Sequence, residues 1–160
     1  MDLIEPILKI LRDSLSYGAL HVCRGNYTKE ISGLLSGSYA SLSDFFSLVQ
    51  PDILTLEFST PRAGEIGDLF INEYIANQTM LGLGVVNPKT EKIEGVEFII
   101  SKVEEALKHL PPEKIWLNPD CGFATFETRP MNSFEVISNK INAMKKAQTI
   151  LRKKHGIYRS

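Results

Sequence analysis

Two cysteines, one histidine and one glutamate stand out because each lies near the end of an apolar segment and each is a potential metal ligand. His21 and Cys23 are two residues apart, and side chains alternate along a strand, so the pair points to one side. Glu57 and Cys121 each end or follow a further apolar run. One imidazole, two thiolates and one carboxylate form an acceptable zinc shell, and such a site can bind and activate a thiol.

The same residues have simpler interpretations when each is taken alone. A single cysteine is more often a buried apolar residue than a ligand, and two cysteines can form a rare disulfide. Glu57 could pair with Arg62 across a turn, which is the preferred interpretation of that glutamate by itself. Only the convergence of all four residue types at strand ends favours a metal site.

Length and composition predict one soluble globular domain. The chain has 160 residues, enough to bury a core, and its fractions of 43% hydrophobic and 23% charged residues are ordinary. A formal net charge of -1 gives no reason to expect nucleic acid or an anionic membrane as the main partner.

The N-terminal region and the cysteine usage predict a cytoplasmic location. No apolar run reaches the length of a membrane span. Two distant cysteines, without a signal peptide, indicate a reducing compartment and free or metal-bound thiols. A secretory leader is excluded by five charged residues among the first twenty, Asp2, Glu5, Lys9, Arg12 and Asp13.

The C-terminal region is basic. No acidic residue follows Glu135, whereas seven basic residues do, namely Lys140, Lys145, Lys146, Arg152, Lys153, Lys154 and Arg159. We interpret them as the solvated face of a terminal helix, with a basic contact surface as the alternative.

Apolar periodicity predicts alternating helices and strands. The predicted helices cover residues 2–16, 41–49 (capped by Ser41 or Ser43), 64–77, 94–109 and 132–154. The predicted strands cover residues 18–23, 53–58, 80–86 and 114–118, with a glycine- and serine-rich loop over 24–40. Trp116 lies within the last strand and is expected in the core rather than as a stacking platform.

This order predicts a parallel sheet that forms about half of a barrel. Strands alternating with helices imply parallel pairing and right-handed crossovers. Each candidate ligand lies at the C-terminal end of its strand, where a β/α barrel places its active site. Four strand–helix units are half of the eight in a TIM barrel, so we predict an α/β half-barrel as a single domain over residues 1–160.

Three segments resemble the C-terminal part of the catalytic barrel of cobalamin-independent methionine synthase. They are His21-Val22-Cys23, Glu57 with Ser59, and Asn118-Pro119-Asp120-Cys121-Gly122. The resemblance runs from about residue 17 to residue 126. The variants His-Val-Cys-Arg-Gly-Asn and Leu-Gly-Leu-Gly-Val-Val look like the short bacterial and archaeal branch, which lacks the duplicated N-terminal barrel.

That family transfers a methyl group to the sulfur of homocysteine and so makes methionine. The resemblance implies a zinc-dependent S-methyltransferase of methionine biosynthesis, similar to 5-methyltetrahydropteroyltriglutamate–homocysteine methyltransferase. The zinc ligands that it implies are His21, Cys23, Glu57 and Cys121. We further expect Ser59 to contact substrate and Asp120 to accept a hydrogen bond from His21, fixing the imidazole tautomer, although Asp120 could instead cap a turn after Pro119.

The chain departs from the long enzymes of the family in its donor region. Those enzymes carry an Asp-x-His-Ser element after the seventh barrel strand, which helps to protonate the leaving group. Here the matching stretch over 86–90, Val-Asn-Pro-Lys-Thr, has no histidine. The methyl donor therefore stays open between a methylated folate and a methylcobamide carried by a corrinoid protein.

The chain also lacks the first half of the barrel, which in the family holds the amino group of homocysteine. We therefore expect it to be inactive alone and to be completed by an N-terminal half-barrel chain or a second copy. Two alternatives stay open: a component of a methylcobamide-dependent methyltransferase that acts on another thiol, and a zinc-binding remnant without catalysis.

A half-barrel has consequences for stability. Strands 18–23 and 114–118 would be sheet edges with unpaired backbone groups. We predict that the chain is not a compact, stable monomer in dilute solution, because the inner face would lack half of its packing. The residues expected to line that inner face are Val22, Leu54, Leu56, Val85, Ile115 and Leu117, or their neighbours.

Overall fold

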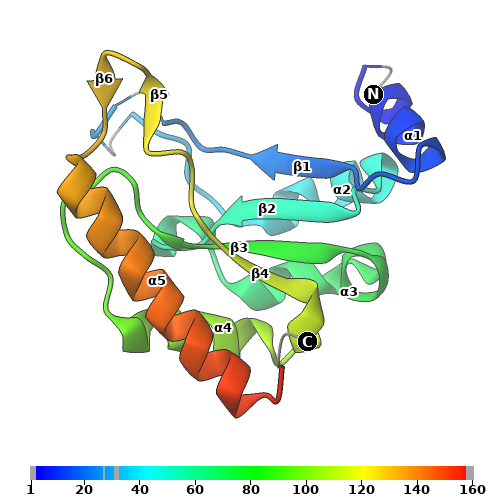
Figure 1. Ribbon diagram of the computed structural model, residues 1–160. Coiled ribbons are helices and arrows are strands. Elements are labelled where there is room, and N and C mark those ends of the chain that lie inside the picture. Colours follow the sequence, from blue (N-terminus) through cyan, green and yellow to red (C-terminus); the bar gives the residue numbers. More distant parts are fainter. Residues whose placement is uncertain (1–2, 27, 31–32, 158–160) are drawn as a thin grey trace.

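A four-stranded parallel sheet forms the centre of the molecule in the computed structural model (Figure 1), which describes residues 3–26, 28–30 and 33–157. The strands lie in the order β1-β2-β3-β4, and every neighbouring pair is parallel. Their bounds are β1 (Ala19–Val22), β2 (Ile53–Glu57), β3 (Met80–Val86) and β4 (Ile115–Pro119). The predicted parallel α/β fold with strands alternating with helices is therefore confirmed.

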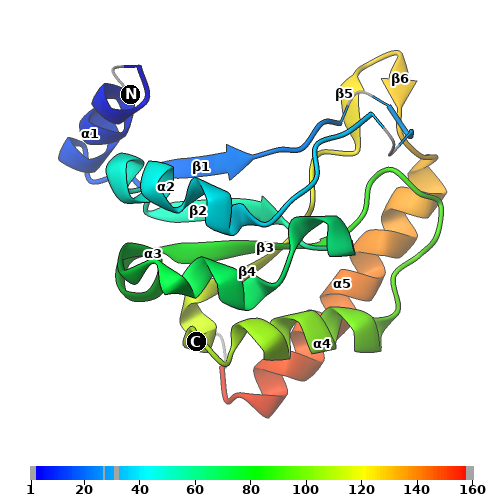
Figure 2. The same cartoon turned by 180° about the vertical axis from the view of Figure 1, so that it is seen from behind.

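In the described residues, one α-helix precedes the sheet, three connect its strands, and a long one follows its last strand. They are α1 (Glu5–Asp13), α2 (Ser43–Val49), α3 (Glu73–Gln78), α4 (Val96–Ala106) and α5 (Phe134–Lys154). Seen from behind, α2, α3 and α4 lie on one side of the sheet (Figure 2). The long helix α5 packs along α4.

The helix predicted over 64–77 is divided into two pieces, and a further 3-10 turn comes before it. Two 3-10 turns, η2 (Pro61–Ala63) and η3 (Ile66–Ile71), come before the short helix α3. The division occurs at Asn72, whose backbone is extended and whose side-chain oxygen accepts the N–H of Ile75 to cap α3. Its amide group also donates to Ser43 and Ser47 on α2, so tertiary contacts fix this break.

The second helix starts differently from the prediction. Neither Ser41 nor Ser43 caps it; instead the Ser38 hydroxyl accepts the N–H of Ala40 and caps a 3-10 turn, η1 (Tyr39–Leu42), which leads into α2. A small antiparallel hairpin, β5 (Ala124–Phe126) with β6 (Arg129–Pro130), was not predicted, because such short strands carry no readable periodicity.

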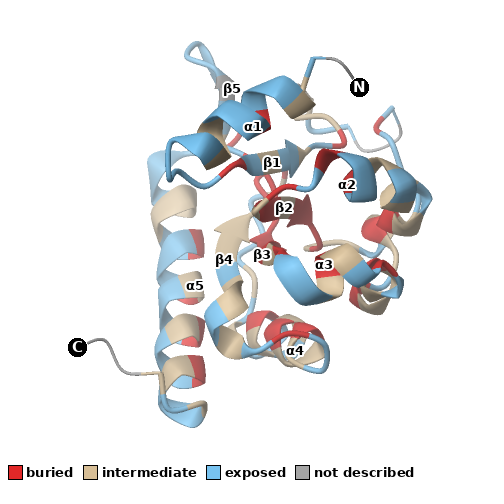
Figure 3. Ribbon diagram, turned by 90° about the vertical axis from the view of Figure 1, so that its right-hand side faces the viewer, coloured by how far each residue is buried: buried red, intermediate tan, exposed pale blue. Residues whose placement is uncertain are grey.

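The alternation of side chains gives the sheet two different faces (Figure 3). Leucines of β2 and β3 and Val85 are fully buried and join the helices in the main core, while Val22, Ile115 and Leu117 pack against it. These residues therefore do not line the inner face of a barrel, and that face is formed by their neighbours, which the prediction named as the alternative. Since His21 points to the opposite face, its neighbours Leu20 and Val22 must point to the helices.

The face away from the helices is mainly polar. Strand pairing aligns His21 with Thr55, Thr55 with Gly82 and Gly82 with Trp116. Trp116 was expected in the core but is 50% exposed, because it belongs to this face and to an edge strand. In the part of the chain that the structure describes, β1 pairs only with β2 and β4 only with β3, so both ends of the sheet are edges.

The basic terminal helix follows the prediction with one exception. Lys145, Lys146 and Lys153 are exposed, and Arg159 lies outside the described residues. Lys140 is wholly buried, and its Nζ lies 3.0 Å from Glu94 Oε2 and donates to the carbonyl of Lys92. No described helix combines the length and the apolar character needed to cross a membrane.

We predict that Lys140→Met lowers the free energy of unfolding by about 3–5 kcal/mol, because it leaves the carboxylate of Glu94 nearly buried without its cation. Urea unfolding of the purified protein measures this loss. Lys145→Met is the matched control on the exposed side of α5 and should change stability by less than about 0.5 kcal/mol. Equal effects of the two substitutions would contradict the role of the buried pair.

Candidate metal centre

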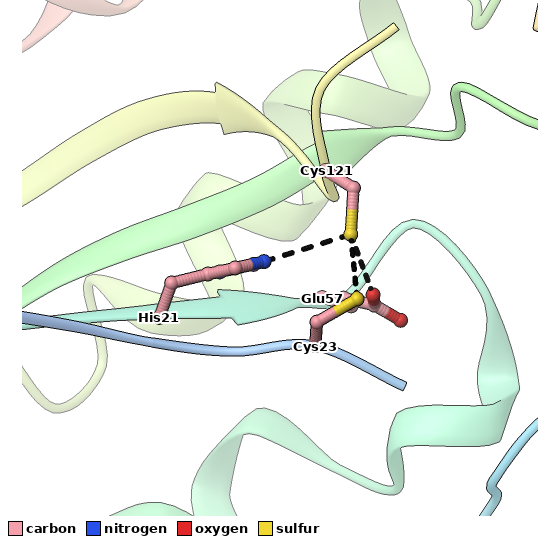
Figure 4. Close-up of side chains that lie close together, drawn as sticks. All are labelled: His21, Cys23, Glu57 and Cys121. Atoms are coloured by element: carbon pink, nitrogen blue, oxygen red, sulfur yellow. Dashed lines mark hydrogen bonds between the residues drawn. The ribbon is translucent and has the colours of Figure 1, made fainter. Parts of the chain in front are cut away.

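Four side chains that are distant in sequence meet at the carboxyl edge of the sheet (Figure 4). His21 lies in β1 and Cys23 directly after it, Glu57 ends β2, and Cys121 follows β4. Cys121 Sγ lies 3.1 Å from Cys23 Sγ, 3.0 Å from Glu57 Oε1 and 3.5 Å from His21 Nε2. All four candidate ligands named from the sequence are thus brought together.

The cluster has the composition of a zinc site and comes close to the size that one zinc ion would impose. One donor atom from each residue can be chosen so that all four lie within 4.8 Å of one another. Bonds of about 2.0–2.3 Å from one zinc ion place its ligand atoms at most about 4.6 Å apart. One nitrogen, two sulfurs and one oxygen match the ligands that zinc uses in proteins.

The ring of His21 is oriented by the neighbouring strand. Its Nδ1 lies 3.0 Å from the backbone oxygen of Thr55, which can only accept, so Nδ1 carries the proton. The lone pair of Nε2 is then free and faces Cys121, as a metal ligand requires. The expected hydrogen bond from His21 to Asp120 is therefore wrong, since Thr55 has that role.

Asp120 instead holds the chain that follows β2. Its Oδ1 accepts the N–H groups of Phe58 and Ser59, both at 3.1 Å, and its Oδ2 accepts the Ser59 hydroxyl. Burial raises the pKa of Asp120 to about 6, against the opposing effect of these hydrogen bonds. Asp120 thereby fixes Ser59 beside Glu57, and the expected substrate contact of Ser59 stays a prediction.

A buried aromatic and cationic pair supports the glutamate. The Tyr39 hydroxyl donates to the carbonyl of Val22 and accepts the N–H of Glu57, each at 3.1 Å, so it links β1 to β2. The guanidinium of Arg24 lies 4.1 Å from the centre of the Tyr39 ring. Sequence reasoning missed both residues, because they lie in a segment without periodic pattern.

The carboxylate of Glu57 has two partners at once. Its Oε1 accepts the N–H of Arg24 at 3.1 Å, and its Oε2 lies 3.6 Å from Arg62 Nη2. The ion pair with Arg62 that the sequence offered as an alternative to metal binding is thus present together with the cluster.

The cluster is unfavourable for negative charge unless a cation is present. Burial is the largest cause that raises the pKa of the Cys121 thiol, followed by its contacts with Glu57 and Cys23. A divalent cation would reverse this effect and deprotonate the thiols. The N–H of Gly25 donates to Cys23 Sγ at 3.2 Å, so the backbone also contacts this sulfur.

Two glycines of β3 make room for the residues around the centre. A Cβ on Gly84 would lie 2.5 Å from Asp120 Oδ1 and from the carbonyl oxygen of Leu56, and one on Gly82 would lie 2.8 Å from Thr55 Oγ1. Residues 82 and 84 are therefore glycines because the side chains on this face of the sheet leave no room for a Cβ.

A second buried lysine lies beside the centre and was also missed. Lys89 is 4% exposed, and its Nζ lies 3.3 Å from Asn26 Oδ1. Asn26 in turn donates to the carbonyl of Gly122, next to Cys121. The stretch 86–90, which lacks the histidine of the long enzymes, thus places the ammonium group of Lys89 close to the segments that carry Cys23 and Cys121.

Comparison with known proteins assigns the chain to a family. Residues 19–148 match the model of the cobalamin-independent synthase catalytic domain. A methionine synthase of Pyrococcus horikoshii is 27% identical over 150 residues, which are 94% of this chain and 38% of that protein. A 5-methyltetrahydropteroyltriglutamate–homocysteine methyltransferase of Bacillus licheniformis is 27% identical over 113 residues, or 69% of this chain and 14% of that protein.

Solved structures show the same fold. A B12-independent methionine synthase of a Shewanella species, in complex with selenomethionine, superposes with a TM-score of 0.67 at 22% identity, over 87% of this chain and 39% of that one. The four parallel strands therefore correspond to part of a larger catalytic barrel. The chain spans less than two fifths of the length of the Pyrococcus relative.

We predict that Gly84→Ala lowers the free energy of unfolding by about 1–3 kcal/mol, because the added methyl group overpacks against Asp120 and the backbone of Leu56. Urea unfolding measures the loss. The control is Gly33→Ala, where a Cβ meets nothing within 4 Å, and its effect should be small. An unchanged midpoint for Gly84→Ala would show that the polar face tolerates a side chain there.

Proposed function

Since the chain belongs to the cobalamin-independent methionine synthase family, we propose that it takes part in methyl transfer to the thiol of homocysteine, which gives methionine. The metal is zinc, and its ligands are His21, Cys23, Glu57 and Cys121. The observation that carries this proposal is the meeting of their four donor atoms within 4.8 Å at the carboxyl edge of the sheet.

The residues around the cluster prepare it for a substrate thiol. Zinc held there would lower the pKa of that thiol, so that the nucleophilic thiolate exists at neutral pH. Thr55 keeps Nε2 of His21 available, and the N–H of Gly25 holds Cys23 Sγ in place. Glu57 supplies the hardest ligand atom of the four, so it is the ligand that a soft sulfur replaces.

The two candidate methyl donors differ in what they need in order to leave after they give up the methyl group. The new bond joins the sulfur to the methyl carbon, and the electron pair of the broken bond stays with the donor. A methylated folate leaves through a nitrogen that needs a proton, whereas a methylcobamide leaves without one. The stretch 86–90 lacks the histidine of the long enzymes, which favours a methylcobamide over a methylated folate.

We propose that a partner completes the barrel around this domain of residues 1–160. Support comes from the described residues, in which the two edge strands have no further strand partner and no helix covers the face that carries His21 and Thr55. Helix α1 also exposes Ile7 and Ile10, at 60% and 67%. The partner is a separate N-terminal half-barrel chain or a second copy, and it would supply the contacts to the amino group of homocysteine.

A zinc-binding protein without catalysis is the competing function. It is supported by the same open edges, because a module that never meets a partner would keep them open. Homocysteine decides between the two: it should change the spectrum of the cobalt-substituted protein if the site accepts a thiol, and should have no effect on a closed, purely structural site.

We predict about one zinc ion per chain, bound through both thiolates. Loss of a group that only hydrogen-bonds to a metal ligand lowers metal affinity by about 10–100-fold. Cys23→Ser and Cys121→Ser each remove a ligand itself, so each should lower zinc affinity by more than that. Elemental analysis and chelator competition measure it. His109→Gln is the control, since His109 is exposed and stacks on Phe70 away from the cluster. Full zinc content in the double cysteine variant would refute the site.

We predict that the isolated chain associates, because edge strands with free N–H and C=O groups pair with other chains. Light scattering and thermal unfolding over a range of concentrations test this, and the midpoint should rise with concentration. A monomer with a sharp, concentration-independent transition would remove the structural reason for a partner. The zinc site would not be affected by that outcome.

A further inference from the structure

The Glu57 carboxylate faces the cluster with one oxygen and a partly buried arginine with the other. Its Oε1 accepts the N–H of Arg24 and lies 3.0 Å from Cys121 Sγ. Its Oε2 lies 3.6 Å from Arg62 Nη2. A charge-assisted hydrogen bond between such groups is shorter, about 2.8 Å. Glu57 and Arg62 therefore attract each other without forming the hydrogen bond that their charges allow.

Both partners keep buried polar atoms that lack a hydrogen bond. Among the described residues, Glu57 Oε2 and Arg62 Nε and Nη1 are buried and have no partner. Leaving such atoms unsatisfied costs free energy, and native proteins avoid it unless function requires it. Because a guanidinium presents a planar fork of donors that fits a carboxylate, these groups are complementary.

The backbone of Arg62 is held in place, so its side chain starts from a defined position beside the carboxylate. The carbonyl of Arg62 accepts Arg24 Nη1 and the N–H of Gly37, each at 3.0 Å. Two residues later, Gly64 adopts a φ of +78°, and a Cβ there would lie 2.9 Å from Ser38. The turn that carries Arg62 is thus held on both sides.

The movement required of Glu57 is small. A shift of about 0.8 Å toward Arg62 would convert the present contact into a charge-assisted hydrogen bond. Rotation about the side-chain torsions of Glu57 achieves this without a backbone change. Because both oxygens belong to one carboxylate, this movement also changes the position of Oε1, whose present neighbours are the Arg24 N–H and Cys121 Sγ.

We propose that Arg62 is a positioning residue that receives the Glu57 carboxylate when a substrate thiol takes its place among the metal ligands. The inference rests on the proposed function. A displaced carboxylate with no partner would be an isolated buried charge, which is strongly unfavourable. Arg62 removes that penalty, so it favours thiol binding without being needed for metal binding.

The test separates metal affinity from thiol affinity. Zinc affinity is measured by chelator competition, and homocysteine is titrated into the cobalt-loaded protein, where thiolate ligation is seen by absorption. In Arg62→Met, zinc affinity should stay close to that of the wild type. Homocysteine affinity should fall about tenfold, or about 1.4 kcal/mol. Arg62→Lys should be intermediate, since it keeps the charge but not the fork.

Two further variants complete the design. Arg12→Met removes an arginine that pairs with Glu5 on α1, far from the site, and should change neither affinity. In a Glu57→Gln background the neutral amide no longer needs Arg62, so Arg62→Met should have little additional effect. This cycle remains informative if either single variant is less stable than the wild type.

Two outcomes would overturn the proposal. One is an unchanged homocysteine affinity in Arg62→Met. The other is a parallel loss of zinc and homocysteine affinity, which would make Arg62 a support for Glu57 as a ligand. Failure of the proposed function would be recognised in the wild type itself, whose cobalt form would not respond to homocysteine, and it would overturn both proposals together.

Discussion

The structure depends on the alternation of side chains along parallel strands that share one register. Because His21, Cys23 and Glu57 occupy equivalent alternating positions, they all point away from the helices, and the residues between them point into the core. A shift of one residue in β1 would move both potential ligands into the apolar layer. Packing of the leucines against the helices therefore specifies the metal centre as strictly as it specifies the fold.

The polar side of the sheet places several negative groups within a small buried space. Glu57, Asp120 and two thiols meet there, and the compensating groups are backbone N–H groups and the guanidinium of Arg62. This arrangement adds little to the free energy of unfolding, because the attraction between buried charges offsets the cost of their desolvation only where the geometry is good. A cation would find there an environment that already favours its positive charge.

The sequence predicted the strands, their parallel order and the four residues of the cluster, because residue type and position at strand ends are local signals. It left the two faces undecided, although the alternation that starts at His21 contains the information needed to assign Leu54 and Leu56 to the core. Other features were out of reach. Burial of Lys140 and of Arg24 depends on partners from distant segments, and the exposure of Trp116 depends on β4 being an edge.

The segment after β4 crosses the carboxyl edge of the sheet toward β1, and it brings Cys121 to Cys23 (Figures 1 and 4). In a flat sheet, three strand spacings of about 4.8 Å would separate the two edges by about 14 Å. An ion bound between these cysteines thus connects the first strand to the chain that leaves the last one. Metal binding and any association at the edges are therefore linked equilibria. If the metal strengthens that association by some factor, association must strengthen metal binding by the same factor.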